Sequence, residues 1–237
     1  MSAAQGRQQQ DLNCKTLSNN GKVIIEGNHI ILDGITFDGP NINIGNHALE
    51  NNTTGACNVA VGKKALLSNT TGSWNAAISC YALQNNTTGS YNTGVGISSL
   101  LNNTTGNYNV AIGDSALLNN TAGNVNTALG LQALKNNTTG DDNLACGHDA
   151  MFSNTVGYIN SAFGPDALYS NLSGYINTAV GYAALYNNTA GYYNTGIGAW
   201  TLYHATGNQN TALGTNATYN VNAITSGKKC SFDVMFV

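Results

Sequence analysis

The chain repeats one short sequence unit with a 17-residue period, and this period limits the possible fold more than any other feature. A glycine after an Asn- and Thr-rich cluster marks each unit. It recurs at a constant 17-residue step from Gly55 to Gly191, and then after a 16-residue step at Gly207. An Asn stands three residues after each marker, and Ala-Leu usually follows later in the unit. A partial unit begins at Asn41, so about eleven units occupy residues 41–220.

A 17-residue unit is too short for the helix pairs of α-solenoids, whose repeats take about 33 residues or more, but it suits one coil of a β-solenoid. Strings such as NVAIG at residues 109–113 alternate as a short strand does. Gly and Asn tolerate positive φ and supply corners. We therefore predict an all-β protein, a parallel β-solenoid (β-roll or β-helix) of about eleven 17-residue coils. The string GDSALLNN at residues 113–120 leaves room for one helical turn but not for a long helix.

Residues at equivalent positions of successive units form a column along the solenoid. Two such columns flank the small residue at the centre of each expected strand. Because alternate residues of a strand share one face, we expect both columns to point into the core. The first column is Val59, Ala76, Thr93, Val110, Thr127, Leu144, Ser161, Thr178, Thr195 and Thr211, and the second is Val61, Ile78, Val95, Ile112, Leu129, Cys146, Phe163, Val180, Ile197 and Leu213.

The Asn after each marker glycine predicts a structural ladder. Stacked amides in successive coils could satisfy polar groups that a thin core would leave unpaired. The alternative is that each Asn only adopts a turn conformation. The ladder residues are Asn58, Asn75, Asn92, Asn109, Asn126, Asn143, Asn160, Asn177, Asn194 and Asn210.

Each unit also carries more apolar side chains than one coil can bury. The column of Leu66 and the adjacent column of Leu67 point to opposite sides unless a helical turn intervenes, and a third, aromatic-rich column precedes the strands. Long apolar stripes usually mark an interface, so we predict a homotrimer. The candidate interface residues are Trp74, Tyr91, Tyr108, Phe152, Tyr169, Tyr186, Tyr193 and Tyr203.

The low charge of the chain excludes some partners. Charged residues make up 8% of the chain and the net charge is −3, so the Lys/Arg footprint of a nucleic-acid-binding protein is missing. No apolar stretch approaches the ~20 residues of a membrane span. Residues 1–20 are polar and Gln-rich, and we expect no secretory signal peptide. The five cysteines are unevenly spaced and odd in number, which favours free thiols in a reducing compartment.

The search for catalytic or metal-binding groups gives little. Neither Gly62-Lys63-Lys64 nor Gly227-Lys228-Lys229 completes a phosphate-binding loop. The histidines at 29, 47 and 204 occupy different repeat positions and form no triad with a repeated Ser or Asp. One unit gathers titratable groups that could form a metal site, but with Cys146 expected in the core we predict no metal, no cofactor and no enzymatic activity. These groups are Asp141, Asp142, Cys146, His148 and Asp149.

Four segments follow from the pattern. Residues 1–20 have neither repeat nor alternation and are expected to be a flexible attachment segment. Residues 21–40 carry short apolar runs and are expected to form an irregular β cap over the open core. Residues 41–220 form the repeats, and residues 221–237 are expected to supply a capping strand.

The strings NVAIG at 109–113 and NTALG at 126–130 resemble the repeats of trimeric autotransporter adhesin (YadA-like) heads, which are left-handed parallel β-rolls. The longer unit NTALGLQALKNNTTG at 126–140 is more similar to repeat arrays in fibre proteins of phages and large DNA viruses. This resemblance implies a left-handed trimeric solenoid. It also implies a structural fibre, spike or capsid-associated protein of a virion, assembled in the host cytoplasm on other virion proteins.

Two other functions are kept as alternatives. A carbohydrate-binding adhesin could stack exposed aromatic rings on host surface glycans. An ice-binding protein could use a ladder of Thr on one flat face, but the candidate ladder, which runs from Val59 to Thr211, is mixed and is expected to point inward.

Overall fold

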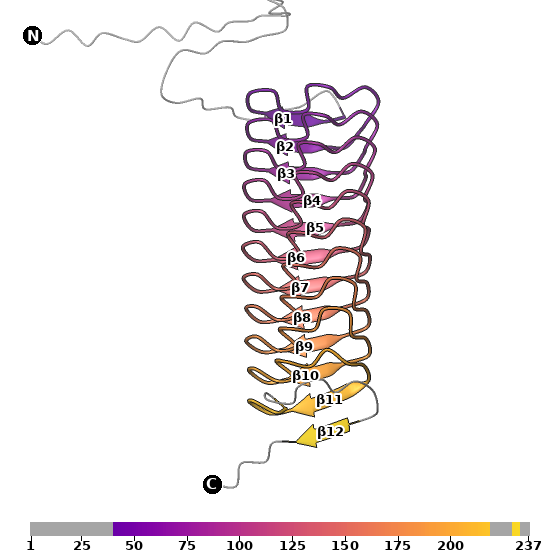
Figure 1. Ribbon diagram of the computed structural model, residues 1–237. Coiled ribbons are helices and arrows are strands. Elements are labelled where there is room, and N and C mark those ends of the chain that lie inside the picture. The colour runs from indigo at the N-terminus through magenta and orange to yellow at the C-terminus, as the bar shows by residue number, and fades with distance from the viewer. Residues whose placement is uncertain (1–39, 219–228, 233–237) are drawn as a thin grey trace, which may run out of the picture. The chain divides into compact units, whose positions relative to one another are not determined.

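The chain forms a parallel β-solenoid in which each coil adds one short strand to a single sheet (Figure 1). The structure, a computed structural model, describes residues 40–218 and 229–232. Its twelve strands stack in sequence order and all pairs are parallel. The strands are β1 (Ile42–Ile44), β2 (Val59–Val61), β3 (Ala76–Ile78), β4 (Thr93–Val95), β5 (Val110–Ile112), β6 (Thr127–Leu129), β7 (Leu144–Cys146), β8 (Ser161–Phe163), β9 (Thr178–Val180), β10 (Thr195–Ile197), β11 (Asn210–Leu213) and β12 (Lys229–Phe232).

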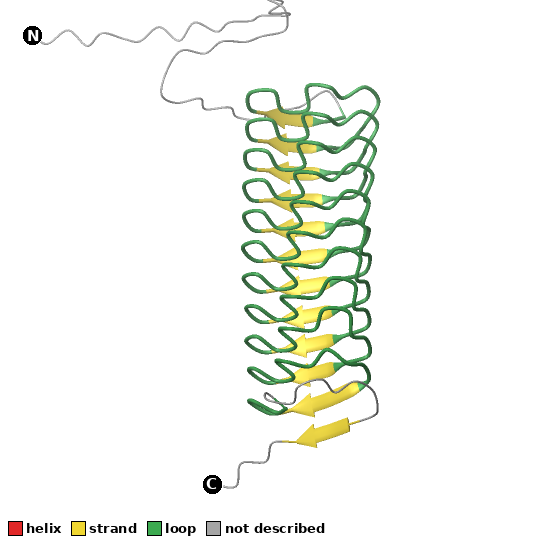
Figure 2. Cartoon of the chain, in the orientation of Figure 1, coloured by secondary structure: helices red, strands yellow, loops and turns green. Residues whose placement is uncertain are grey.

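The pairing register follows the sequence period and confirms the predicted fold class. Val110 pairs with Thr127, the equivalent position of the next unit. Thr195 pairs with Thr211 across the 16-residue step, so the missing residue is absorbed outside the strands. The described residues contain no helix, and the segment at 113–120 consists of turns (Figure 2). Accordingly, no described helix is long and apolar enough to cross a membrane.

The expected segments at the two ends of the chain are described only in part. The attachment segment 1–20 lies outside the described residues, as does all of the expected 21–40 cap except Pro40. Within the expected C-terminal segment 221–237, β12 pairs in parallel with β11, with Thr211 opposite Cys230.

Left-handed backbone conformations let adjacent residues face the core together. Ala65 and Leu66 are both fully buried, although adjacent residues of a strand would point to opposite sides. Leu66 has a φ of 52°, which turns the chain and brings its side chain to the inner side. Its N–H donates to the carbonyl of Ala82 in the next coil at 3.1 Å, and this helps to hold a conformation that non-glycine residues seldom adopt. The following column, beginning at Leu67, stays half-exposed.

The core is thin, and this overturns the expected direction of the two flanking strand columns. In β2 to β10 the buried residue is the central one, such as Ala60 or Ala111, whereas the central Asn43 of β1 is exposed. At the same position, a Cβ added to Gly196 would lie 3.4 Å from Leu185 Cγ in the facing segment. Only Ala or Gly therefore fits between the strand and the facing Leu column. The larger residues on either side, from Val59 and Val61 onward, point outward.

The second glycine of each unit is required by the stacking of the coils. Gly113 has a φ of +141°, and a Cβ added there would overlap the backbone carbonyl of Gly130 in the next coil. The same close approach recurs at the equivalent glycine of the other coils, so this position disfavours side chains. Among the described residues only Ser79 carries a side chain there, with a φ of 125°.

Candidate functional site

The outward face of the sheet is a strip of uncharged side chains. It consists of the two strand columns that flank the buried Ala position, and they contain only Val, Ile, Leu, Phe, Cys, Ala, Ser and Thr. Cys146 belongs to this outward face and not to the core, which corrects the expectation from sequence. Its large exposed members are Ile44, Ile78, Ile112, Phe163, Val180, Ile197 and Leu213.

The Thr-containing column also faces outward, contrary to the sequence-based expectation. Its orientation removes one of the two objections to an ice-binding face. The other objection stands, because only five of its ten positions between 59 and 211 are Thr, and Val110 and Leu144 interrupt the series. The column does not form the regular hydroxyl ladder that such a face requires.

The predicted interface residues fall into two separate aromatic columns. The first column lies two residues before the start of each strand, and its rings are exposed. Its members are Trp74, Tyr91, Tyr108 and Tyr193. The others, Phe152, Tyr169, Tyr186 and Tyr203, follow the buried Leu column by one residue and are half-buried. They stand seven residues from the first set along each coil, so the eight residues do not form one continuous surface.

The rings in these columns stack face to face, except that of Tyr193, which packs edge-on against Tyr192. Trp74, Tyr91 and Tyr108 stack with centroids 4.8 Å apart and planes within 6°. A stack from Phe152 to Tyr203 has centroid spacings of 4.9 to 5.2 Å. Because each ring covers the face of its neighbour, an inner ring of a stack presents mainly its edge to solvent. A sugar stacks on a ring face, so the geometry leaves few faces free for glycan binding.

A third stack escaped sequence reasoning. Tyr158, Tyr175 and Tyr192 stack at 4.8 to 5.0 Å beside the exposed column. Their recurrence at the repeat period was the available signal. Close packing affects the phenols. Burial is the main cause that raises the pKa of Tyr175, and the neighbouring phenols of Tyr192 and Tyr158 raise it further.

The predicted Asn ladder residues are buried and are joined from coil to coil. The backbone N–H of Asn126 donates to Asn109 Oδ1 at 2.9 Å, and its Nδ2 donates to the same oxygen at 3.2 Å. Nδ2 also donates to the carbonyl of Gly140 at 2.7 Å. The ladder begins earlier than expected, since Asn58 N donates to Asn41 Oδ1. The amides therefore satisfy backbone groups as well as one another.

A second buried ladder was missed. Asn120 Nδ2 donates to Asn103 Oδ1 at 2.8 Å and to the carbonyl of Gly123 at 3.0 Å. The sequence signal is an Asn at this position in nine successive units, but a role in the corner of the coil explains the same recurrence. The members are Asn52, Asn69, Asn86, Asn103, Asn120, Asn137, Asn154, Asn171 and Asn188.

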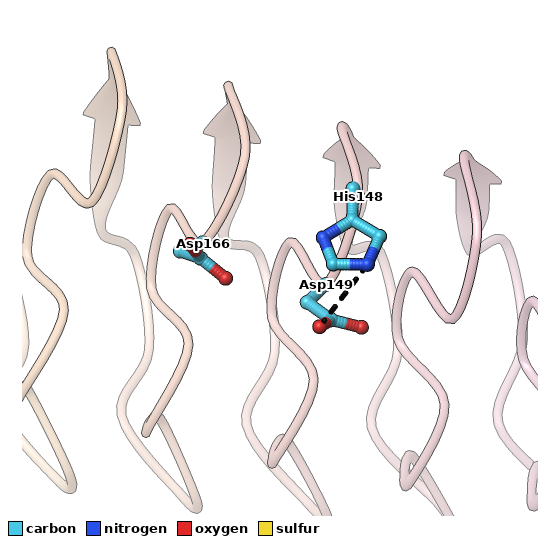
Figure 3. A group of neighbouring side chains, drawn as sticks. All are labelled: His148, Asp149 and Asp166. Atoms are coloured by element: carbon cyan, nitrogen blue, oxygen red, sulfur yellow. Dashed lines mark ion pairs between the residues drawn. The ribbon is translucent and has the colours of Figure 1, made fainter.

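One group of titratable side chains gathers on the turns after β7 and β8 (Figure 3). His148, Asp149 and Asp166 each offer a ligand atom, and these atoms lie within 4.8 Å of one another. Burial is the main cause that raises the pKa of Asp166, and the negative charge of Asp149 raises it further. The charge of His148 lowers it.

The titratable group differs from the set expected from sequence. Asp141 lies elsewhere on the coil, where it accepts a hydrogen bond from Asn124 N at 2.7 Å, and Asp142 is exposed. Asp166 was missed because it lies in the next unit, one full repeat after Asp149. The thiols of Cys57, Cys80 and Cys146 are free.

Comparison of the chain with protein-family models, curated proteins and solved structures finds no match. The fold by itself defines the class of protein, a single-sheet parallel β-solenoid built from 17-residue repeats.

Proposed function

We propose that the protein is a non-enzymatic structural fibre, spike or capsid-associated component of a virion, built as a homotrimer that associates through the outward strand face. The observation that carries this proposal is the apolar character of the column from Val61 to Leu213. All ten of its members are apolar, although none packs in the core of its own chain.

A neighbouring exposed column provides an internal comparison. The position two residues further along each coil holds Lys63, Ile97, Asp114, His148 and Pro165 in different units, and so varies freely between charged and apolar residues. The solenoid itself therefore tolerates charge at an exposed position beside the sheet. The uniform strand column is best explained by a surface that covers it.

The dimensions of the face suit association between copies. Eleven coils at ~4.8 Å each give a stack of roughly 50 Å, and a three-residue strand spans about 10 Å. The strand strip alone thus offers roughly 500 Å². Stable interfaces need about 800 Å² per partner, so the exposed columns beside the strands, including Trp74 and Tyr108, must contribute to the contact.

The resemblance of the repeats to viral and phage fibre arrays supports the assignment to a virion. The near-identical coils also lack the long insertions from which solenoid enzymes build a cleft. The main alternative, a glycan-binding adhesin, is less favoured because the aromatic rings cover one another. Contact with a host surface is part of the proposal as a further role of the fibre.

Light scattering coupled to size-exclusion chromatography tests the trimer. The full chain should elute at three times its 24.6 kDa mass. Ile112→Lys, on the outward strand face, should yield a monomer with unchanged circular dichroism. Thr105→Lys, at an exposed corner, should remain trimeric. A wild-type monomer at micromolar concentration would overturn the proposed assembly.

Quantitative mass spectrometry of purified virions tests the location. The protein should be enriched in particles together with other structural proteins, and removal of residues 1–20 should prevent incorporation while leaving the oligomer folded. Binding of the trimer to a glycan array, with no enrichment in particles, would favour the adhesin alternative.

A further inference from the structure

We propose that His148, Asp149 and Asp166 bind one divalent transition-metal ion, of which Zn²⁺ is the best match, and that the ion joins two consecutive coils. His148 and Asp149 follow β7, and Asp166 follows β8 (Figure 3). No other group of three such residues is found within 40–218 and 229–232.

The backbone holds the three ligands in a fixed register. Asp166 N donates to the carbonyl of His148 at 3.0 Å, so the residues that carry the ligands are themselves hydrogen-bonded across the two coils. Asp149 and Asp166 have φ values of 54° and 58°. Because they occupy the same repeat position with similar φ, their Cα–Cβ bonds leave successive coils in similar directions.

The separations suit a small cation. His148 Nε2 lies 3.5 Å from Asp149 Oδ2. Bonds of about 2.1 Å in a tetrahedral zinc site place ligands roughly 3.4 Å apart, so this pair is already spaced for shared coordination. The whole group lies within 4.8 Å, and a movement of up to about 1.4 Å by the half-exposed Asp166 would complete a three-ligand site with one position open to water.

An orphaned oxygen points independently to a ligand. Asp149 Oδ1 is buried and has no hydrogen-bond partner, one of only two such side-chain atoms among the described residues. The other, Asn210 Oδ1, belongs to the last member of the Asn ladder. A buried carboxylate oxygen without a donor is costly, and a cation coordinated by both oxygens of Asp149 would remove that cost.

Local charge leads to the same conclusion. Within the described part of the chain, His148 is the only ion-pair partner of Asp149, and neither carboxylate pairs with a Lys or Arg. The mixed nitrogen and oxygen donors select a transition metal over Mg²⁺ or Ca²⁺, which prefer oxygen alone.

The solenoid does not need these residues for its own stacking. The two positions that hold His148 and Asp149 hold Leu131 and Gln132 one coil earlier, and Tyr182 and Ala183 two coils later. The ligands are therefore a local addition to a coil that folds with other side chains.

Isothermal titration calorimetry of the full chain, stripped of metal with EDTA, tests the site with ZnCl₂ at pH 7.5. We expect one saturable site per chain that His148→Ala and Asp166→Asn each weaken at least about tenfold, comparable to known losses at metal sites. His47→Ala is the matched control, because its ring pairs with Glu50 at 2.7 Å away from the cluster, and it should leave the affinity unchanged. MgCl₂ and CaCl₂ should bind at least about a hundredfold more weakly.

Two results would overturn the proposal. One is the absence of saturable Zn²⁺ binding below about 1 mM. The other is binding that His148→Ala and Asp166→Asn leave intact while both variants keep the wild-type circular dichroism. A thermal scan gives a second measurement, since Zn²⁺ should raise the melting temperature of the wild type and of His47→Ala but not of Asp166→Asn.

Discussion

Replacing Asn126 by Ala tests whether the first Asn ladder stabilises the solenoid or only shapes its turns. The side chain takes part in four hydrogen bonds. Nδ2 donates to Asn109 Oδ1 and to the Gly140 carbonyl, and Oδ1 accepts from the backbone N and the Nδ2 of Asn143 at 3.0 and 3.1 Å. Asn126 is fully buried in the middle of the stack, so water cannot replace these partners without opening the coil.

The cost can be worked out group by group. The Gly140 carbonyl keeps a bond from Asn137 Nδ2, and Asn143 Nδ2 keeps its bond to Gly157. The backbone N–H of Asn143 loses its acceptor, and a buried unsatisfied donor costs about 1–3 kcal/mol. With the small void added, we expect a total of about 3 kcal/mol. For a chain of this size this lowers the melting temperature by roughly 6–12 °C.

The matched control is Asn119→Ala, seven residues earlier. Its half-exposed side chain makes only two bonds, both with the side chains of Asn102 and Asn136, at 3.1 and 3.0 Å. No backbone group loses a partner, so the cost should be below about 1 kcal/mol. Thermal denaturation followed by circular dichroism at two protein concentrations separates folding from oligomer dissociation. Equal losses for the two variants, or a loss below about 2 °C for Asn126→Ala, would refute the reasoning.

Three further outcomes are expected. In urea denaturation, Leu117→Ala should lower the free energy of unfolding by about 3 kcal/mol. Substitution of the half-exposed neighbour, Leu118→Ala, should lower it by less than about 1 kcal/mol, and equal losses would contradict the assigned core. Gly113→Ala, at a φ of +141°, should prevent coil stacking or lower the melting temperature by about 10 °C or more, while Gly196→Ala should be tolerated. The pKa of Asp166 is raised in the folded protein, so the ionised carboxylate at pH 7 lowers the stability of the fold. In EDTA, Asp166→Asn should therefore slightly increase the free energy of unfolding at pH 7. This increase should become smaller toward pH 4, where the wild-type carboxyl is protonated.

The period predicted the fold because a constant spacing permits few architectures. A 17-residue repeat with Gly and Asn at fixed positions requires equivalent backbones to stack, and parallel pairing in register follows from that requirement. The same information did not fix which side of each strand faces inward. That depends on the thickness of the coil, which is set by Leu66 and its equivalents in a left-handed conformation that pattern rules for strands do not anticipate.

The Asn ladders, too, were only partly predictable from the sequence repeats. Recurrence alone predicted stacking of the first ladder, but the chemistry of its bonds depends on geometry. Each Oδ1 before that of Asn210 accepts a backbone N–H from the following coil, as Asn126 does from Asn143 N, and not only an amide N–H. The second ladder, which includes Asn120, recurs equally well and was missed because a corner role already explained an Asn there.

Departures from the repeat are therefore the most informative residues in such a chain. In a solenoid, residues one period apart are neighbours in space, so a chemical group must be sought along a column and not along the sequence. Asp149 and Asp166 are distant in sequence but lie on adjacent coils, and His148 is the only histidine at its repeat position from 46 to 215. The two columns vary along the stack, but only at His148, Asp149 and Asp166 do three such groups meet within the described residues, and a buried oxygen of Asp149 is left unpaired there. Stacking of the coils does not explain this arrangement, whereas a bound cation does.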